Sequence, residues 1–178
     1  MEKVKDTIHI RYANRDEIFD IAVFLHDCWQ AEYREIISED FLDSMKVKDR
    51  HERLLNRFDE KTSELLIMYE GNKLIGVSVF GKSFTEGYEN DGEISALYLR
   101  HEYIGKGYGH YLFIRIEEAL AAKGYEYLVL DLLEGNDIAL KFYIDHDYNK
   151  VADTQYRFGE IDYPLIVLRK RVNGEKLS

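Results

Sequence analysis

The chain has 178 residues, 46% of them hydrophobic and 33% charged, which is enough apolar material for the core of one domain. Its net charge of −10 argues against nucleic acid as the main partner, because phosphate binding needs concentrated lysine and arginine. No apolar run reaches the roughly 18 residues of a membrane helix, and the single cysteine, Cys28, allows no internal disulfide. Since the first residues also lack an apolar signal-peptide stretch, we expect a cytoplasmic protein with no membrane partner.

The first predicted elements are a strand and a long amphipathic helix. Thr7–Tyr12 alternates between apolar and polar residues as a short strand does. Asn14 is a candidate helix N-cap with Glu17 three residues later, and this pairing predicts a helix over Arg15–Tyr33. The apolar face of that helix should contain the residues at helical spacing, which are Ile18, Ile21, Ala22, Leu25, Cys28 and Trp29. Cys28 is therefore interpreted as a core thiol.

The next segment predicts one or two further helices and then a hairpin. Ser38–Phe58 is polar with helical spacing. Glu64–Glu70 and Leu74–Phe80 have the composition of strands, and Gly71-Asn72 between them is a hairpin turn signal. The glycine-rich and acidic stretch Phe84–Gly92 should be a loop.

A strand, turn, helix and strand are expected over Glu93–Leu133. The first strand is Glu93–Leu99, and the last, Tyr127–Leu133, is almost wholly apolar, as in a strand buried on both faces. A helix between them is expected to bury one face and to end at Gly124; that face is Tyr108, Leu112, Ile116 and Leu120. Such a unit should form a parallel crossover.

The C-terminal segment predicts a helix and two strands. Asn136 can cap a helix that runs to about Asp145. Strands should follow over Lys150–Phe158 and Pro164–Arg171, with the proline as the first residue of its strand and the basic run 169–171 as a strand end in solvent. The element order is β-α-α-β-β-β-α-β-α-β-β without a linker, so residues 1–178 are expected to form a single α/β domain.

The turn Gly105-Lys106-Gly107-Tyr108-Gly109 is the first sign of a binding site. It lies between a strand and a helix, where backbone N–H groups and the helix dipole attract an anion. The dinucleotide fingerprint needs glycine where His110 stands, and the P-loop pattern is absent. No cysteine and histidine pattern of a zinc site is present either, so we expect no metal.

Ile104–Gly109 resembles the turn of the GNAT superfamily of N-acetyltransferases, which has the form Arg/Gln-x-x-Gly-x-Gly/Ala. The two glycines match at Gly107 and Gly109, whereas Ile104 replaces the usual Arg or Gln. Lys106 supplies part of the missing positive charge. A second GNAT-like pattern, Asn-x-x-Ala-x-x-Phe-Tyr, is matched in full by residues 136–143, although the usual Gly-Phe that follows is Asp147-Tyr148 here.

This resemblance implies the GNAT fold: a mixed, mostly antiparallel sheet of about seven strands, with helices on both faces and a V-shaped opening between strands four and five. It implies acetyl-CoA as the co-substrate. The expected contacts with it are the main chain of Leu97, Tyr98 and Leu99, the turn residues Ile104, Gly105, Lys106, Gly107, Tyr108, Gly109 and His110, and the side chains of Asn136, Phe142 and Tyr143.

Two residues are predicted to take part in catalysis. Tyr143 is placed beside the thioester sulfur by the resemblance, and a phenol can donate a proton or a hydrogen bond to the departing thiolate. Glu93 is the candidate base that deprotonates the attacking ammonium, with a strand-end glutamate in water and a water chain as its alternatives. A backbone N–H at a strand bulge near Leu97–Leu99 is expected to stabilise the oxyanion. His110 and His146 are interpreted as structural.

The acceptor site is predicted from the first helices and the last strands. Residues 29–34, Trp-Gln-Ala-Glu-Tyr-Arg, resemble a broad bacterial GNAT branch, and 156–159 resembles bacterial polyamine acetyltransferases. Acidic and aromatic side chains could hold a small cation such as a polyamine by charge and cation–π contact. The candidate residues are Trp29, Tyr33, Glu35, Glu39 and Tyr156.

The expected function is therefore transfer of an acetyl group from acetyl-CoA to a small cationic amine. Two alternatives remain. One is acetylation of a protein N-terminus or lysine, and the other is a CoA-binding module without turnover, which Ile104 favours. A homodimer is possible on this sequence.

Overall fold

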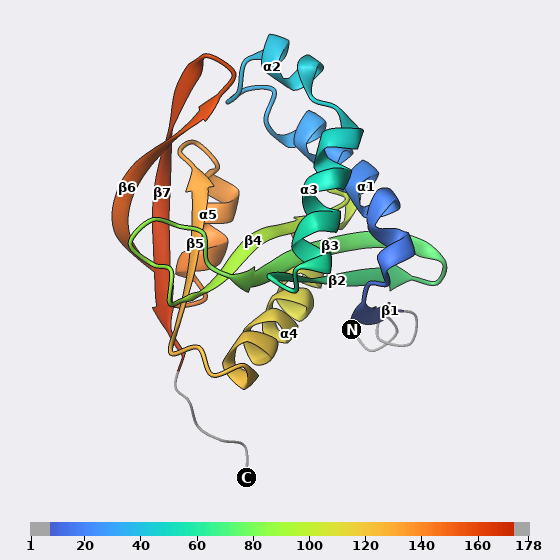
Figure 1. Ribbon diagram of the computed structural model, residues 1–178, viewed down its shortest axis with the longest axis vertical. Coiled ribbons are helices and arrows are strands. Elements are labelled where there is room, and N and C mark those ends of the chain that lie inside the picture. The colour runs from blue at the N-terminus through green and yellow to red at the C-terminus, as the bar shows by residue number, and fades with distance from the viewer. Residues whose placement is uncertain (1–7, 173–178) are drawn as a thin grey trace.

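A seven-stranded sheet with helices on both faces is present in the computed structural model, which describes residues 8–172 (Figure 1). The strands are β1 (Ile8–Tyr12), β2 (Ser63–Glu70), β3 (Lys73–Lys82), β4 (Gly92–Leu99), β5 (Tyr127–Leu133), β6 (Asn149–Phe158) and β7 (Ile161–Arg171). They lie in the order β1-β2-β3-β4-β5-β7-β6, and every neighbouring pair is antiparallel except β4 and β5. This architecture confirms the predicted fold; Thr7, the predicted first residue of β1, lies outside the described residues.

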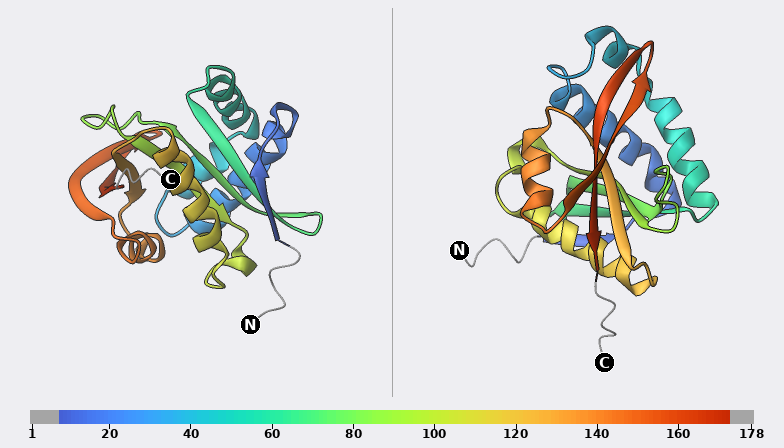
Figure 2. Two further views of the ribbon diagram at one scale, coloured as in Figure 1. Left: turned by 90° about the horizontal axis from the view of Figure 1, so that it is seen from below. Right: turned by 90° about the vertical axis from the view of Figure 1, so that its left-hand side faces the viewer.

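The helices divide between the two faces of the sheet. They are α1 (Ile18–Glu32), α2 (Glu39–Ser44), α3 (Val47–Asp59), α4 (Tyr108–Ala122) and α5 (Asp137–Ile144), with short 3₁₀ turns at Arg15–Glu17 and His101–Tyr103. Figures 1 and 2 show α1 and α3 on one face and α4 and α5 on the other. The polar segment that predicted one or two helices therefore forms two, α2 and α3. No helix in residues 8–172 is long and apolar enough to cross a membrane.

The α1 face of the sheet is built as the sequence predicts. The Asn14 N–H donates to Glu17 Oε2 at 2.8 Å, so the capping box forms and starts the helical segment. Cys28 is buried, which confirms a core thiol. The predicted apolar face packs with it on β2 and β3, and the buried residues are Ile18, Ile21, Ala22, Leu25, Leu65, Ile67, Val77 and Val79.

The opposite face is the larger part of the core. Every predicted inward residue of α4 is buried there against alternate residues of β5, and the set is Tyr108, Leu112, Ile116, Leu120, Leu128, Leu130 and Leu132. Tyr143 of α5 and the following Tyr148 lie in the same cluster. Because Leu128, Leu130 and Leu132 point toward α4, the intervening residues of β5 point toward the α1 and α3 side.

β7 begins three residues before its predicted start, since Pro164 lies inside the strand rather than at its first position. The Glu134 N–H donates to the Pro164 carbonyl at 3.0 Å, so this residue's nitrogen also faces the β5 side. The pairing of β5 with β7 ends at Leu133–Leu165. The missing N–H of Pro164 thus faces Glu134, one residue past the last β5–β7 pair, so no hydrogen bond within the ladder is lost.

Candidate active site

The central strands β4 and β5 separate after only two paired positions. Gly92 pairs with Leu128 and Glu93 with Val129, and no further pair joins these strands. From Ile94 onward β4 pairs only with β3, while β5 continues along β7 to Leu133. The predicted opening between the fourth and fifth strands is therefore present, and one backbone edge of each strand faces it.

A β-bulge lies close to the closed end of this opening. Phe80 is opposite Ile94 and Val79 is opposite Ala96, so Ser95 is the extra residue. The sequence-based expectation placed the bulge near Leu97–Leu99, whereas the extra residue, Ser95, comes shortly before that segment. Leu97, Tyr98 and Leu99 instead form the regular open edge of β4, where unpaired main-chain groups can bind amides of a ligand.

The glycine turn before α4 presents free backbone donors. Gly105 and Gly107 have φ of 74° and 87°, a left-handed conformation that favours glycine, and Gly107 is the N-cap of α4. A Cβ on either would meet no atom within 4 Å. The N–H groups of the first helical turn have no intrahelical partner, so this open corner suits an anion. Lys106 is exposed at the turn, whereas Ile104 packs against the core.

His110 and His146 connect the start of α4 with the end of α5. Their ring nitrogens Nδ1 and Nε2 are 2.8 Å apart, and His146 Nδ1 lies 2.7 Å from the Phe142 carbonyl oxygen. The Phe142 ring packs on His146 and lies close to Gly109. The sequence placed His110 and Phe142 at the co-substrate site, and the structure brings both to the first turn of α4.

Asn136, which follows β5, meets Tyr33, which ends α1. The Asn136 side chain caps α5 by accepting from the Ala139 N–H at 3.2 Å, and its amide donates to the Tyr33 hydroxyl at 3.5 Å. The Tyr33 and Tyr98 hydroxyls are 2.9 Å apart. These contacts join α1, β4 and α5 across the gap that the separated strands leave.

The predicted acid, Tyr143, has a buried ring and a free hydroxyl. Phe113, Phe142 and Tyr148 surround the ring. Its hydroxyl forms no hydrogen bond with any residue between 8 and 172. Burial raises the pKa of this phenol well above its usual value, and Tyr33 adds a smaller effect in the same direction. The group therefore stays protonated and can donate.

Glu93, the predicted base, is occupied by hydrogen-bond donors. Its Oε2 accepts from the backbone N–H groups of Phe84 at 2.7 Å and Thr85 at 3.2 Å, and from the hydroxyls of Ser83 and Thr85. Its Oε1 accepts from the Ser95 hydroxyl at 2.7 Å. These five donors occupy both carboxylate oxygens and tie Glu93 to the loop after β3 and to Ser95.

Asp131 is a second carboxylate beside Glu93, and no sequence motif predicted it. It follows the last β4–β5 pair by two residues and points to the same face as Glu93. The side chain reaches solvent, yet the surrounding protein removes enough water to raise its pKa, and the charge of Glu93 raises it further. Periodicity could have indicated it, because it is the single charge inside an otherwise apolar strand.

The predicted acceptor residues do not form one cation cage. Trp29 and Tyr33 do come together, with ring centres 4.8 Å apart, and Phe158 lies against Trp29. Tyr156 is exposed and packs on Phe158. Glu35, however, is exposed and is not among the residues packed in this cluster.

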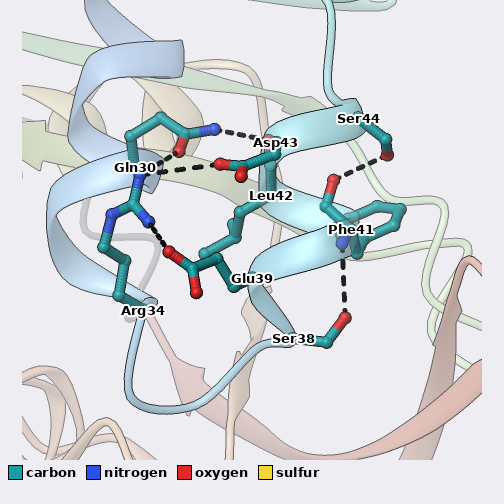
Figure 3. Close-up of polar contacts among 8 residues, drawn as sticks. All are labelled: Gln30, Arg34, Ser38, Glu39, Phe41, Leu42, Asp43 and Ser44. Atoms are coloured by element: carbon teal, nitrogen blue, oxygen red, sulfur yellow. Dashed lines mark hydrogen bonds and ion pairs between the residues drawn. The ribbon is translucent and has the colours of Figure 1, made fainter.

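Glu39 is already used at the corner between α1 and α2. Arg34 donates to Glu39 at 3.0 Å, pairs with Asp43 at 3.7 Å and bonds Gln30, whose amide donates to the Leu42 carbonyl (Figure 3). The Ser38 hydroxyl caps α2 by accepting from the Phe41 N–H. Glu39, one of the residues expected to attract a polyamine, is therefore already paired with Arg34.

Glu32, at the end of α1, lines a surface pocket of about 140 Å³ with Cys28, Leu99 and Arg100. Loss of hydration raises the pKa of this carboxyl from 4.5 to about 7. The folded protein thus binds this proton more tightly than the unfolded chain does. Stability from this group is complete below pH 4.5 and falls as the pH rises toward 7, where the charged form must be kept half-buried.

We expect the Glu32→Gln variant to lack the loss of stability that Glu32 causes as the pH rises toward 7. Between pH 5 and pH 8 the wild type should lose about 1 kcal/mol more unfolding free energy than the variant, after allowance for partial solvent screening. Urea denaturation at the two pH values measures it, with the exposed neighbour changed in Glu35→Gln as the control. Equal pH dependence in Glu32→Gln and wild type would contradict the assignment.

No cluster of three or more His, Cys, Asp or Glu side chains with metal-site geometry occurs in the described part of the chain.

Comparison with known proteins places this geometry in a family. Residues 18–148 match the family model described as the acetyltransferase (GNAT) family. A curated relative, the uncharacterized N-acetyltransferase YuaI of Bacillus subtilis strain 168, is 28% identical over 156 residues, which cover 86% of this chain and 87% of the relative.

Solved structures share the fold at lower identity. The PaiA N-acetyltransferase of Thermoplasma acidophilum, solved with coenzyme A, has a TM-score of 0.73 and 22% identity, covering 93% of this chain and 99% of that one. The ribosomal-protein-alanine N-acetyltransferase of Brucella melitensis has a TM-score of 0.71 and 17% identity, covering 92% and 99%. The fold is therefore shared by N-acetyltransferases, one of which is named for the alanine of a ribosomal protein.

Proposed function

This chain belongs to the GNAT family of acetyltransferases, and from that premise we propose that it transfers the acetyl group of acetyl-CoA to a primary amine of a small molecule. The observation that carries the proposal is the early separation of β4 from β5, together with a Tyr143 hydroxyl that stays protonated and bonds no residue between 8 and 172. An acetyltransferase needs a narrow opening for the thioester-bearing arm of CoA and a hydrogen-bond donor for its sulfur. The separated strands would provide the opening, and Tyr143 would provide the donor.

The residues around the opening fit acetyl-CoA. The open N–H groups near Gly107 and Gly109, with Lys106 beside them, would bind the diphosphate. The free edge of β4 at Leu97 to Leu99 would hydrogen-bond the amides of the pantetheine arm, as a neighbouring strand does. The bound thioester supplies an activated acetyl carbonyl. CoA in the PaiA structure from T. acidophilum supports this assignment.

Tyr143 would act on the leaving sulfur. A thiol has a pKa of about 8.5, well below that of this buried phenol, so the proton stays nearer to the tyrosine. The group therefore stabilises the departing thiolate mainly by donating a hydrogen bond. A donor aimed at developing charge in a dry site lowers the barrier by roughly 3 kcal/mol.

Asp131 rather than Glu93 is our candidate for the proton of the attacking ammonium. Glu93 holds five donors, whereas Asp131 accepts from no other side chain in residues 8–172 and lies two residues past the last β4–β5 pair. A carboxylate with a raised pKa is a better proton acceptor than an unperturbed one. Glu93 would then position the loop after β3 and add negative charge near the amine.

Binding of acetyl-CoA is the direct test of this function. Gly109→Glu puts a carboxylate at the second position of α4, where it suits the helix dipole but repels a diphosphate. We expect the dissociation constant for acetyl-CoA, measured by calorimetry, to rise at least about tenfold, a loss of about 1.4 kcal/mol. A thiol-release assay with amines should fall in parallel when acetyl-CoA is limiting.

Gly109→Ala is the matched control. The added Cβ would make only ordinary contacts, 3.6 Å from Leu99 and 3.8 Å from Phe142, so fold and affinity should be kept. Wild-type protein that fails to bind acetyl-CoA would sink the proposed function. Binding without thiol release from any amine or peptide would favour a non-catalytic module, and release with peptides alone would favour a protein acetyltransferase.

A further inference from the structure

One face of α3 carries three arginines without carboxylate partners. Arg50, Arg53 and Arg57 are spaced by three and four residues, so they lie along the same side of the helix over roughly 10 Å. None of them forms an ion pair with a carboxylate in residues 8–172. We call this set the α3 arginine face.

The absence of partners is unusual in this acidic protein. Seven of the eleven arginines in residues 8–172 form ion pairs, and three of the remaining four are on the α3 arginine face. Burial is the largest influence on Arg50 and Arg57 and lowers the pKa of each, and Arg53 lowers both further. Arg50 also has a buried Nε with no hydrogen-bond partner. Such an arrangement costs folding free energy unless a ligand uses it.

Contacts place the arginines beside the opening. The Arg50 guanidinium lies 5.1 Å from the Trp29 ring centre, near Tyr33 and Tyr98. At the other end of the α3 arginine face, the Arg57 guanidinium lies 4.3 Å from the Phe84 ring centre. It is also close enough to Glu93 for the charge of that carboxylate to act on it. The α3 arginine face therefore follows β4 from Tyr98 down to Glu93, along the length of the opening.

The opposite wall of the opening has the complementary charge. Asp131 on β5 points to this same side of the sheet, next to Glu93. An ammonium attracted to the carboxylates would place the rest of its molecule alongside the arginines. A molecule that satisfies both walls is an amine that also carries an anionic group.

We infer that the acceptor is a small zwitterionic amine, whose carboxylate or phosphate is bound by the α3 arginine face while its amine meets Asp131. This inference rests on the proposed acetyl transfer. It differs from the polyamine expectation, since a polycation would meet three unpaired guanidinium groups, and the acidic Glu39 is paired with Arg34. Trp29 and Phe158 add an apolar wall beside Arg50.

Matched acceptors that differ only in the anion test it. The pairs are L-phenylalanine with 2-phenylethylamine, and O-phosphoethanolamine with ethanolamine, with spermidine as the polycation. For at least one pair, kcat/KM of the wild type should be about tenfold higher for the anionic member, and the responding pair tells carboxylate from phosphate. Arg53→Gln, at an exposed position, should remove most of that preference by raising KM.

Two variants show whether the effect is specific. Lys48→Gln, on another side of α3 and paired with Glu52, should leave the preference unchanged. Asp131→Asn should lower kcat/KM for both members of a pair alike, because both carry the amine. Arg57→Gln repeats the test if Arg53 alone contributes little.

Several results would overturn the inference while leaving acetyl transfer intact. Equal rates within both pairs would overturn it, and so would a preference for spermidine. Arginine variants that raise KM for acetyl-CoA rather than for the acceptor would also overturn it, because the arginines would then bind the phosphates of CoA. If turnover is too slow to measure, calorimetry with L-phenylalanine and O-phosphoethanolamine decides, and no binding of either overturns it. Failure of acetyl-CoA binding itself is a separate result and removes the proposed function.

Discussion

Tyr143→Phe is expected to lower kcat about a hundredfold while the dissociation constant for acetyl-CoA changes less than twofold. Phenylalanine keeps the ring that packs between Phe113, Phe142 and Tyr148, so α5 should stay in place. Only the hydroxyl is lost, and removing one donor from a developing anion costs roughly 10²-fold in rate. Thiol release under saturating acetyl-CoA measures kcat, and calorimetry measures binding.

Tyr148→Phe is the matched control for this prediction. Tyr148 lies in the same aromatic cluster and is almost fully buried, but it follows the end of α5 and has no role in the proposed mechanism. Within residues 8–172 no group meets its hydroxyl at hydrogen-bonding geometry, although the charge of Glu117 acts on it, so its loss should not lower stability much. Equal rates for Tyr143→Phe and wild type would remove Tyr143 from the mechanism.

Arg169→Met should lower the unfolding free energy by about 3 kcal/mol at pH 7. Arg169 donates to Asp91 through two nitrogens, at 2.6 and 2.9 Å, and Asp91 is only 4% exposed. Its guanidinium also lies 3.8 Å from the Tyr127 ring centre. Removing one partner of a buried pair leaves the other charge uncompensated, which costs roughly 3–5 kcal/mol. Urea denaturation followed by circular dichroism gives the change.

Arg171→Met separates this effect from the loss of any arginine on the same strand. Arg171 pairs with Glu126 at 2.8 Å, but both side chains are more than 60% exposed. An exposed pair contributes at most about 1 kcal/mol, so this variant should stay near wild type. Similar losses for the two variants would show that burial of the Asp91 pair contributes nothing special.

The fold could be predicted because its signals are local. The capping box at Asn14, the apolar spacing of α1 and α4, and the glycines at the turns each depend on a few neighbouring residues. The start of β7 was wrong because tolerance of Pro164 depends on where β5 ends. The basic run 169–171 does end the strand and Arg171 is exposed, but Arg169 and Lys170 are partly buried in pairs with Asp91 and Glu117 from distant segments.

The candidate site was predicted only where a motif exists. The two family patterns led to Gly107, Gly109, Asn136 and Tyr143, but no pattern led to Asp131, whose importance depends on where two strands separate. Glu93 was chosen by residue type and position. Its five donors come from positions 83–85 and 95, and such saturation is invisible until the chain is folded. The spacing of Arg50, Arg53 and Arg57 can be seen in the sequence, but their lack of carboxylate partners in residues 8–172 can be seen only in the structure.

The separation of β4 from β5 also bears on association with other chains. Unpaired strand edges normally recruit a strand from another molecule and promote aggregation. Here the two free edges lie within the sheet and converge at Glu93 and Val129, so a strand that belongs to another sheet cannot enter far enough to pair with both. The narrow pantetheine arm, which carries two amides, can enter. The narrow opening thus leaves hydrogen-bonding groups available to the cosubstrate while it prevents strand pairing with other molecules.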